Sequence, residues 1–310
     1  MSTGVGEAHQ PALSSIILDS DQLLEHEGIP THLLVVGAGY IGVEFASIYR
    51  ALGSKVTLIE QKERLMPEWD PLAGAKVAEQ LINDGVTIHV NQPFNSHNIL
   101  RDTDLILMAT GRAGNIQGLG LENIGVRADK FVEVTNQMQV HSEEFSNVFA
   151  IGDVNGIALL DSVAFTQARV GVQNILDKPT TFDMYAIPKS IYTNPLVAMV
   201  GLTQMDSDRF NEPIETIIDE VETISDNNRS VVEPEKTLIK LLYQPESKRL
   251  LGCLAIGPGA TEIVNGTGMA LYTGSNVEGL LNVATVHPSP SEYFIRALQK
   301  RFDPTLSTRR

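Results

Sequence analysis

The stretch Gly37–Gly42 limits most strongly what this chain can fold into. It has the pattern G-x-G-x-x-G and directly follows the short apolar run Leu33–Val36. Apolar residues with helical spacing continue to Gly53, and a second apolar run covers Lys55–Ile59. A strand, a glycine turn, a helix and a second strand in this order predict a βαβ unit with parallel strands.

Each glycine of this pattern has its own expected role in binding a dinucleotide. Gly37 allows the tight turn off the strand, Gly39 lets the backbone approach a pyrophosphate, and Gly42 lets the helix pack closely on the sheet. Tyr40 and Ile41 begin the helix, whose N-terminus presents unpaired N–H groups and a partial positive charge to phosphates. We therefore expect these residues to bind a nicotinamide dinucleotide.

Glu60 ends the second strand, near the spacing of about 20 residues at which a carboxylate binds the adenosine ribose. A carboxylate at this place also repels a 2′-phosphate, so the sequence favours NAD over NADP. Lys62 and Arg64 follow closely and offer a site for that phosphate if Glu60 turns away. The cofactor is therefore predicted as NAD(P), with NAD preferred.

The net charge narrows the classes of partner. The 310 residues include 23 basic and 38 acidic ones, a formal charge of -15, which repels nucleic acid and anionic membrane surfaces. No apolar run approaches the roughly 18 residues that a membrane span needs, and no leader segment is visible. We expect a cytoplasmic protein that binds neither nucleic acid nor membranes. The sequence suggests no metal site.

A single cysteine, Cys253, excludes an internal disulfide and dithiol chemistry within this chain. It lies in an apolar stretch, where a free cysteine is typically a small core residue.

The order of expected elements divides the chain into four parts. Residues 1–30 form a connecting segment, and residues 31–110 alternate strands with helices, which predicts an α/β fold with a parallel sheet covered on both faces. Residues 111–183 hold short strands, a turn and a helix near 162–176. Residues 184–310 alternate strands with two helical stretches, which indicates an α+β domain with an antiparallel sheet.

Five short motifs occur in order along the chain. They are GAGYIGVEF at Gly37–Phe45, Ala109–Arg112 with Asn115, Val148–Asp153, Ile191–Thr193 with Pro195, Val200 and Gly201, and His287-Pro288 with Glu292. In this order and at this spacing they resemble the pyridine nucleotide-disulfide oxidoreductases. The resemblance covers nearly the whole chain. It implies a flavoprotein that uses FAD and NAD(P), with a Rossmann-type NAD(P)-binding domain, a partial FAD-binding domain and a C-terminal dimerisation domain.

The resemblance also implies roles for single residues near the nicotinamide and the flavin. Tyr40 would gate the nicotinamide pocket, and Glu44 would pair with a lysine beside the flavin. Gly111 and Arg112 would lie where the chain crosses back into the FAD domain.

Other roles implied by the resemblance fall in the second half of the chain. Gly152 and Asp153 would form the second flavin motif, whose aspartate binds the ribityl chain. In relatives that reduce disulfides, the histidine of this motif reaches the active site of the partner subunit and acts there as an acid or base. His287 and Glu292 would be the corresponding catalytic pair in this chain. The part from 184 to 310 would make a homodimer.

The sequence departs from the family in two places. The first glycine-rich βαβ unit, which holds the adenosine and pyrophosphate of FAD, has no counterpart, nor has the redox disulfide that follows it in many members. Met1–Gly4 instead resembles a turn late in that domain and Ile17–Leu24 the linker after it, so residues 1–30 would be a remnant. The stretch between Val90 and Asp104 is also shorter than in relatives. We therefore expect this chain to bind FAD poorly.

Three functions remain open on this basis. Residues Gly111–Asn115, Leu121–Gly125 and Arg296–Leu298 with Phe302 resemble soluble NAD(P) transhydrogenases, which pass hydride through flavin without a disulfide. His287 instead favours dihydrolipoamide dehydrogenase. The third alternative is a truncated, non-catalytic module that binds NAD and dimerises. We prefer the transhydrogenase type, and whether this chain alone is an active enzyme stays open.

Overall fold

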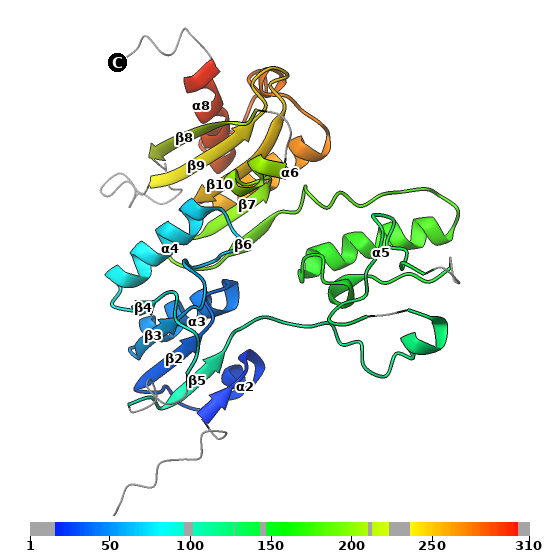
Figure 1. The fold of residues 1–310 in the computed structure, drawn as a ribbon. Helices are drawn as coiled ribbons and strands as arrows, with labels where there is room; N and C mark the ends of the chain where they lie inside the picture. Colours follow the sequence, from blue (N-terminus) through cyan, green and yellow to red (C-terminus); the bar gives the residue numbers. More distant parts are fainter. Residues whose placement is uncertain are drawn as a thin grey trace, which may run out of the picture. The chain divides into compact units, whose positions relative to one another are not determined.

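The computed structural model describes residues 16–95, 102–126, 128–142, 147–209, 213–222 and 236–302 (Figure 1). The chain divides into two compact units, residues 1–111 with 191–195, and residues 112–190 with 196–310. The expected parts 111–183 and 184–310 thus fall largely into one unit, and their separation into two domains stays a prediction. The expected turn at Met1–Gly4 lies outside the described residues.

The first unit contains a five-stranded parallel sheet in the order β1-β5-β2-β3-β4 (Figure 1). Val36, at the end of β2, pairs with Ile59 of β3 and Met108 of β5, so these carboxyl ends meet at one edge of the sheet. The elements are β1 (Ile17–Leu18), α2 (Ser20–Glu25), β2 (His32–Val36), α3 (Tyr40–Ala51), β3 (Lys55–Ile59), α4 (Pro71–Asn83), β4 (Thr87–His89) and β5 (Leu105–Met108).

The helices of this unit lie on one face of its sheet. Helix α3 packs on β2 and β3 and touches α4, and Tyr49 of α3 donates a hydrogen bond to the carbonyl of Leu23 in α2. Both faces are buried, as expected, but among the described residues the second face carries no helix. Its apolar side chains, which include Leu34 and Ile106, are packed by Ile17 and Phe94.

The second unit begins with residues that form few regular elements. These are η1 (Leu121–Ile124), η2 (Gly152–Asn155) and α5 (Asp161–Ile175). The short strands expected here appear, within the described ranges, only as isolated pairings of Val134 with Val140 and Gln139 with Phe149. Buried Met138 packs with the inner face of α5 and with Phe182.

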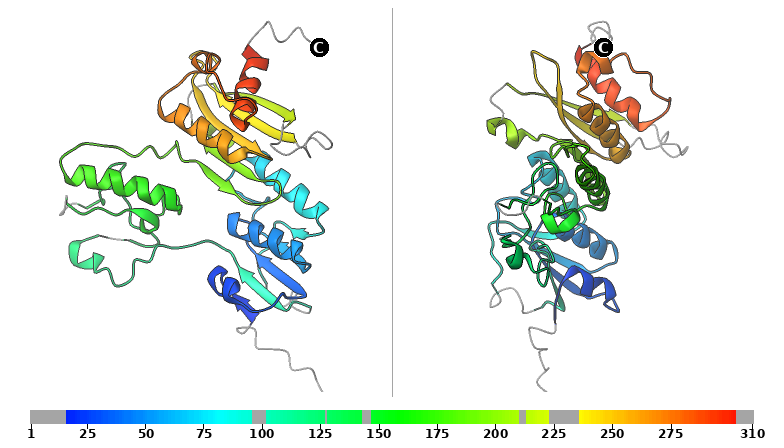
Figure 2. Two further views of the ribbon diagram at one scale, coloured as in Figure 1. Left: turned by 180° about the vertical axis from the view of Figure 1, so that it is seen from behind. Right: turned by 90° about the vertical axis from the view of Figure 1, so that its right-hand side faces the viewer.

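The rest of the second unit is an antiparallel sheet in the order β6-β7-β10-β9-β8, with helices on one face (Figures 1 and 2). Its elements are β6 (Lys189–Ile191), β7 (Val197–Gly201), η3 (Gln204–Arg209), β8 (Glu215–Glu222), β9 (Lys236–Tyr243), β10 (Leu250–Ile256), α6 (Ala260–Tyr272), α7 (Val277–Leu280) and α8 (Pro290–Phe302).

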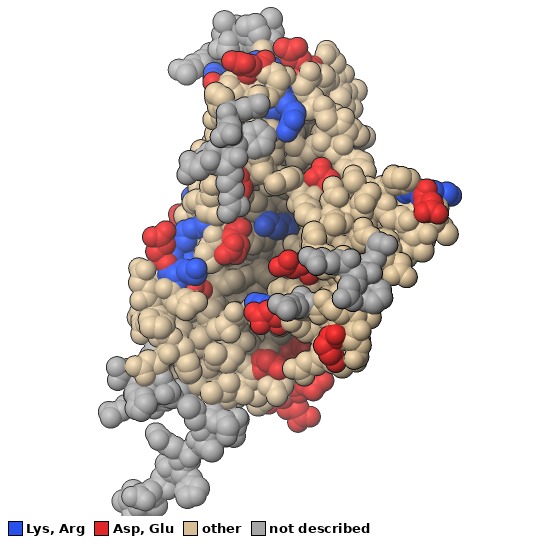
Figure 3. Space-filling view, turned by 45° about the vertical axis from the view of Figure 1, so that its right-hand side comes forward, with Lys and Arg blue, Asp and Glu red and all other residues tan. Residues whose placement is uncertain are grey.

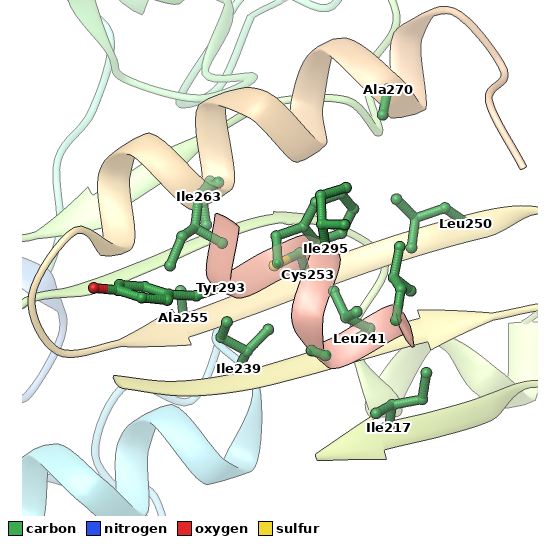
Figure 4. Close-up of a cluster of buried hydrophobic side chains, with 14 of the residues drawn as sticks. Ile217, Ile239, Leu241, Leu250, Cys253, Ala255, Ile263, Ala270, Tyr293 and Ile295 are labelled. Carbon is green, nitrogen blue, oxygen red and sulfur yellow. The ribbon is translucent and has the colours of Figure 1, made fainter. Parts of the chain in front are cut away.

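The core of this α+β part lies between the sheet and helices α6 and α8. Figure 4 shows Ile239 and Cys253 of the strands pointing toward Ile263 of α6 and Ile295 of α8. Burial raises the pKa of the Cys253 thiol to about 12, although a hydrogen bond with Thr267 opposes the shift. The thiol is therefore protonated at neutral pH and packs as a core residue, as its apolar surroundings in the sequence predicted.

On the face shown in Figure 3, basic residues stand in small separate groups and form no continuous basic surface, while several acidic residues gather in the lower part of the view. No helix within the described ranges is long and apolar enough to cross a membrane. The same residues contain no cluster of three or more His, Cys, Asp or Glu arranged to hold a metal ion. The expectation that nucleic acid is not a partner rests on the net charge and stays a prediction.

Candidate functional site

The glycine turn between β2 and α3 leaves no room for side chains at two of its positions. Gly37 has a φ of +99°, and a Cβ added to it would lie 2.5 Å from the carbonyl oxygen of Ala109. A Cβ at Gly42 would lie 1.9 Å from the carbonyl oxygen of Gly37. Glycine is therefore needed at both positions, for the turn to pack against the residue that follows β5 and for α3 to pack against the turn.

Gly39 differs, because its surroundings are open. It is the N-cap of α3, no side chain caps the helix there, and a Cβ added to Gly39 would meet no atom within 4 Å. Tyr40 is partly exposed at the first helical position, and Ile41 is half-buried beside it. The space beside Gly39 is thus open at the start of α3, where the first N–H groups of a helix have no partner within the helix, and this arrangement suits a phosphate group.

Glu60 lies directly against this turn. Its side chain is buried, Oε2 accepts a hydrogen bond from the amide of Ala38 at 2.7 Å, and Oε1 accepts one from the amide of Lys62 at 2.8 Å. Each carboxylate oxygen has a second lone pair, so Glu60 is still able to accept bonds from ribose hydroxyls. The carboxylate that was expected to bind the cofactor therefore also holds the glycine turn.

Of the two basic residues expected near a 2′-phosphate, the structure leaves only Lys62 exposed. The guanidinium of Arg64 donates to the carbonyl oxygens of residues 65, 66, 67 and 69, at distances of 3.5, 3.0, 2.6 and 3.0 Å. Arg64 is thus committed to the backbone of its own loop. The sequence could not predict this, because every residue has a backbone carbonyl and no residue type marks the ones that Arg64 binds.

Glu44 in α3 is held by the backbone of the segment Ile191–Pro195, which belongs to the same unit. Its Oε1 accepts a hydrogen bond from the amide of Tyr192 at 2.7 Å. Burial raises the pKa of Glu44, and the bond from Tyr192 partly offsets this. The proposed pairing of Glu44 with a lysine beside a flavin stays a prediction.

Gly111 and Arg112 lie at the junction between the two units, as the last residue of the first and the first residue of the second. Both residues are exposed, and Gly111 has a φ of +119°. Their expected part in cofactor binding stays a prediction.

The turn at Gly152 and Asp153 is anchored on α5. Gln167, which is buried, accepts hydrogen bonds through Oε1 from the amide of Gly152 at 2.7 Å and from Nδ2 of Asn155 at 2.8 Å. Asp153 is exposed at the start of η2. The structure thus fixes the backbone of this motif and leaves the carboxylate of Asp153 in solvent.

His287 and Glu292 lie together, as the motif required. Nδ1 of His287 is 2.8 Å from Oε2 of Glu292, and Arg296 binds the other carboxylate oxygen. Burial raises the pKa of Glu292, but the hydrogen bonds and charges of His287 and Arg296 outweigh this and hold the pKa below its usual value. A carboxylate at Nδ1 orients the exposed imidazole and leaves Nε2 for another partner.

A parallel βαβ unit whose glycine turn opens in front of a helix N-terminus, with a carboxylate at the end of the second strand, defines a fold of the Rossmann class. Residues 4–174 match the family model described as pyridine nucleotide-disulphide oxidoreductase, and residues 187–298 match the dimerisation domain of that family. The chain belongs to the pyridine nucleotide-disulphide oxidoreductase family.

Two curated relatives illustrate the range of the family. The chain is 30% identical to a dihydrolipoyl dehydrogenase of Synechocystis sp., over 92% of this chain and 65% of the relative. It is 32% identical to a soluble pyridine nucleotide transhydrogenase of Pectobacterium atrosepticum, over 91% of this chain and 64% of the relative. The chain therefore spans somewhat less than two thirds of the length of these relatives.

Solved structures show the same fold at lower identity. The crystal structure of LpdA from Mycobacterium tuberculosis matches with a TM-score of 0.77 and 24% identity, over 91% of this chain and 64% of that one. The HOCl-induced flavoprotein disulfide reductase RclA from Escherichia coli matches with a TM-score of 0.78 and 24% identity, over 96% and 71%. At this identity the likeness establishes the fold alone.

Proposed function

We propose that this chain binds a nicotinamide dinucleotide at the Gly37–Gly42 turn, NAD(H) in preference to NADP(H). We further propose that it belongs to a FAD-dependent oxidoreductase that transfers hydride between nicotinamide and flavin, most like soluble transhydrogenase. The observation that carries the proposal is the open space in front of Gly39, at a turn whose other two glycines admit no side chain.

In this proposal the residues of the first unit bind and orient the dinucleotide. The amides at the start of α3 receive the pyrophosphate, and the carboxylate of Glu60 accepts hydrogen bonds from the adenosine ribose. Tyr40, partly exposed at the first turn of α3, gates the pocket that receives the nicotinamide. These contacts supply positioning, which is the main contribution of a protein to hydride transfer.

The residues of the chain fit a flavin only in part. A bound flavin would accept or donate the hydride, and the exposed carboxylate of Asp153 suits a hydrogen bond to a polyol hydroxyl. The described ranges contain one unit in which a glycine-rich turn joins a strand to a helix, and in our proposal this unit binds the nicotinamide dinucleotide. A second unit of this kind, for the dinucleotide part of FAD, is not among them, so we derive no step through flavin.

A disulfide oxidoreductase of the dihydrolipoamide dehydrogenase type is the second candidate. It is favoured by the pairing of His287 with Glu292, because an oriented imidazole serves as acid or base for a dithiol. A non-catalytic module that binds NAD and dimerises is the third. A bound flavin, directly visible in the absorption spectrum of the purified protein, would exclude the third candidate. A flavin-free spectrum is the result that we expect for this chain under all three candidates.

Replacing Glu60 by alanine is expected to reduce discrimination against NADPH. The repulsion between the carboxylate and the 2′-phosphate disappears, so the ratio of the Kd values for NADPH and NADH should fall by about tenfold, equivalent to about 1.4 kcal/mol. Calorimetric titration with both nucleotides measures this ratio. Glu60→Gln is the matched control, because it removes the charge and keeps an oxygen for the amide of Ala38. A ratio unchanged in both variants would show that Glu60 does not set the specificity.

We also propose that the chain forms a homodimer through residues 187–298, the part that matches the dimerisation domain. Helix α6 exposes 70% of Met269 and leaves Tyr272 beside it in solvent, which suits a symmetric apolar contact. Sedimentation velocity at micromolar concentration should show a dimer, and Met269→Glu should shift it to monomer. Phe165→Glu on α5, where the native side chain is 72% exposed, is the control that should leave the dimer intact. A wild-type chain that sediments as a monomer would contradict this proposal.

A further inference from the structure

Ala38 stands at the centre of the glycine turn, and both of its backbone groups are held. Its amide donates to Oε2 of Glu60 at 2.7 Å, and its carbonyl oxygen accepts a hydrogen bond from the amide of Met66 at 2.8 Å. The side chain of Ala38 is fully buried. The orientation of the peptide groups next to Gly37 and Gly39 therefore depends on two partners that come from the loop after β3.

The hydrogen bond from Met66 to Ala38 depends on a strained backbone conformation at Met66, which other contacts must stabilise. Met66 has a φ of +50°, in the left-handed region that side chains other than glycine disfavour. Its side chain is buried and its carbonyl oxygen accepts from the guanidinium of Arg64 at 3.0 Å. The same guanidinium binds the carbonyl oxygens of Pro67 at 2.6 Å and Trp69 at 3.0 Å, so one side chain fixes the loop at the strained residue and directly after it.

Helix α4 packs tightly against the same loop. A Cβ added at Gly74 would lie 2.4 Å from the carbonyl oxygen of Leu65 and 3.4 Å from Nη1 of Arg64. The loop thus lies between α4 and the glycine turn. A displacement of the loop where it contacts α4 would therefore also displace Ala38.

We infer that Arg64 is a positioning residue for the dinucleotide site, acting through Met66 and Ala38 without contacting the cofactor. This inference rests on the proposed binding of a nicotinamide dinucleotide at the turn. The guanidinium keeps the loop in place, the amide of Met66 fixes the carbonyl of Ala38, and the turn keeps its N–H groups directed at the open space. Arg64 therefore acts equally on NADH and NADPH, in contrast to a residue that binds a 2′-phosphate.

The test compares Arg64→Ala with a matched arginine elsewhere in the unit. Arg50, in the last turn of α3, also donates to backbone carbonyls, those of Asp84 at 2.5 Å and Ser54 at 3.3 Å. Arg64→Ala should weaken the binding of NADH and of NADPH by the same factor, about tenfold. A loss of this size corresponds to roughly one lost hydrogen bond. Arg64→Lys should restore only part of the affinity, because an ammonium cannot match the planar set of donors. Arg50→Ala should lower the Tm and leave both affinities unchanged.

A second readout needs no nucleotide. With ¹⁵N-glycine labelling, the amide signals of Gly37 and Gly39 should move in Arg64→Ala and stay in place in Arg50→Ala. If Arg64→Ala does not fold, Gly74→Ala, which pushes against Leu65 and keeps the arginine, should move the same signals. If the wild type binds neither nucleotide, the proposed function is contradicted. If the glycine signals do not move in Arg64→Ala and Gly74→Ala, only this inference is contradicted. A loss much larger for NADPH than for NADH would also overturn it, since it would place Arg64 on the phosphate.

Discussion

Replacing Gly39 by valine is expected to abolish NADH binding while the protein still folds. Gly39 has φ and ψ of -71° and -176°, which valine adopts readily, and a Cβ there meets no protein atom within 4 Å. The branched side chain would instead fill the space proposed for the pyrophosphate. We expect the Kd to rise at least about 100-fold, or about 2.7 kcal/mol, in a calorimetric titration.

Two other glycines serve as controls for this experiment. Gly266 in α6 also has no atom within 4 Å of an added Cβ, so Gly266→Val should leave NADH binding unchanged. At Gly42 the added Cβ would lie 1.9 Å from the carbonyl oxygen of Gly37, so Gly42→Ala should destabilise the fold itself. If Gly39→Val binds NADH as tightly as the wild type, the dinucleotide does not lie at this turn.

The 310-residue chain should release added FAD on gel filtration and should not turn over steadily. Asp153 offers one hydrogen bond, worth about 0.5 to 1.5 kcal/mol net and up to about 3 kcal/mol with its charge. Micromolar affinity corresponds to about 8 kcal/mol. A single exposed carboxylate on an anchored turn therefore falls far short of holding the cofactor.

Two measurements on the same sample check this expectation. The absorbance of the flavin band reports retained FAD, and NADPH-dependent reduction of thio-NAD reports transhydrogenase turnover. Asp153→Asn should change neither result, because the wild type already falls short. Stoichiometric flavin with steady turnover would contradict the expectation and show that this chain, alone or as a dimer, assembles a complete flavin site.

Where local signals were strong, the sequence predicted the fold closely. The sequence pattern predicts a helix around Pro71–Asn83, and helix α4 has these bounds. Pro71 suits the first position of the helix, and Asp70 caps it by accepting from the amide of Leu72 at 2.9 Å. Strand β8 was not predicted, since its four acidic residues hide the alternation that places Ile217 in the core. Charged residues are common on an edge strand, so they do not argue against one. The alternation of apolar and polar residues was therefore the signal that could have predicted β8.

The candidate site was predictable where it depends on the backbone of consecutive residues. The roles of Gly37 and Gly42 follow from the βαβ pattern, because the turn itself creates the close approaches. The contact of Glu60 with Ala38 and the bonds of Arg64 depend on the conformation of an irregular loop, which no periodicity reveals. The bond between Glu44 and Tyr192 joins residues 148 positions apart and was likewise beyond the reach of local patterns.

The proposed binding of a nicotinamide dinucleotide at the turn between β2 and α3 can be tested by an NMR titration of the ¹⁵N-glycine-labelled chain with NADH. We expect the amide signals of Gly37, Gly39 and Gly42 to shift and saturate together, while those of Gly252 and Gly266 in the second unit stay in place. Saturable shifts confined to other glycines, or no shift at millimolar NADH, would contradict it.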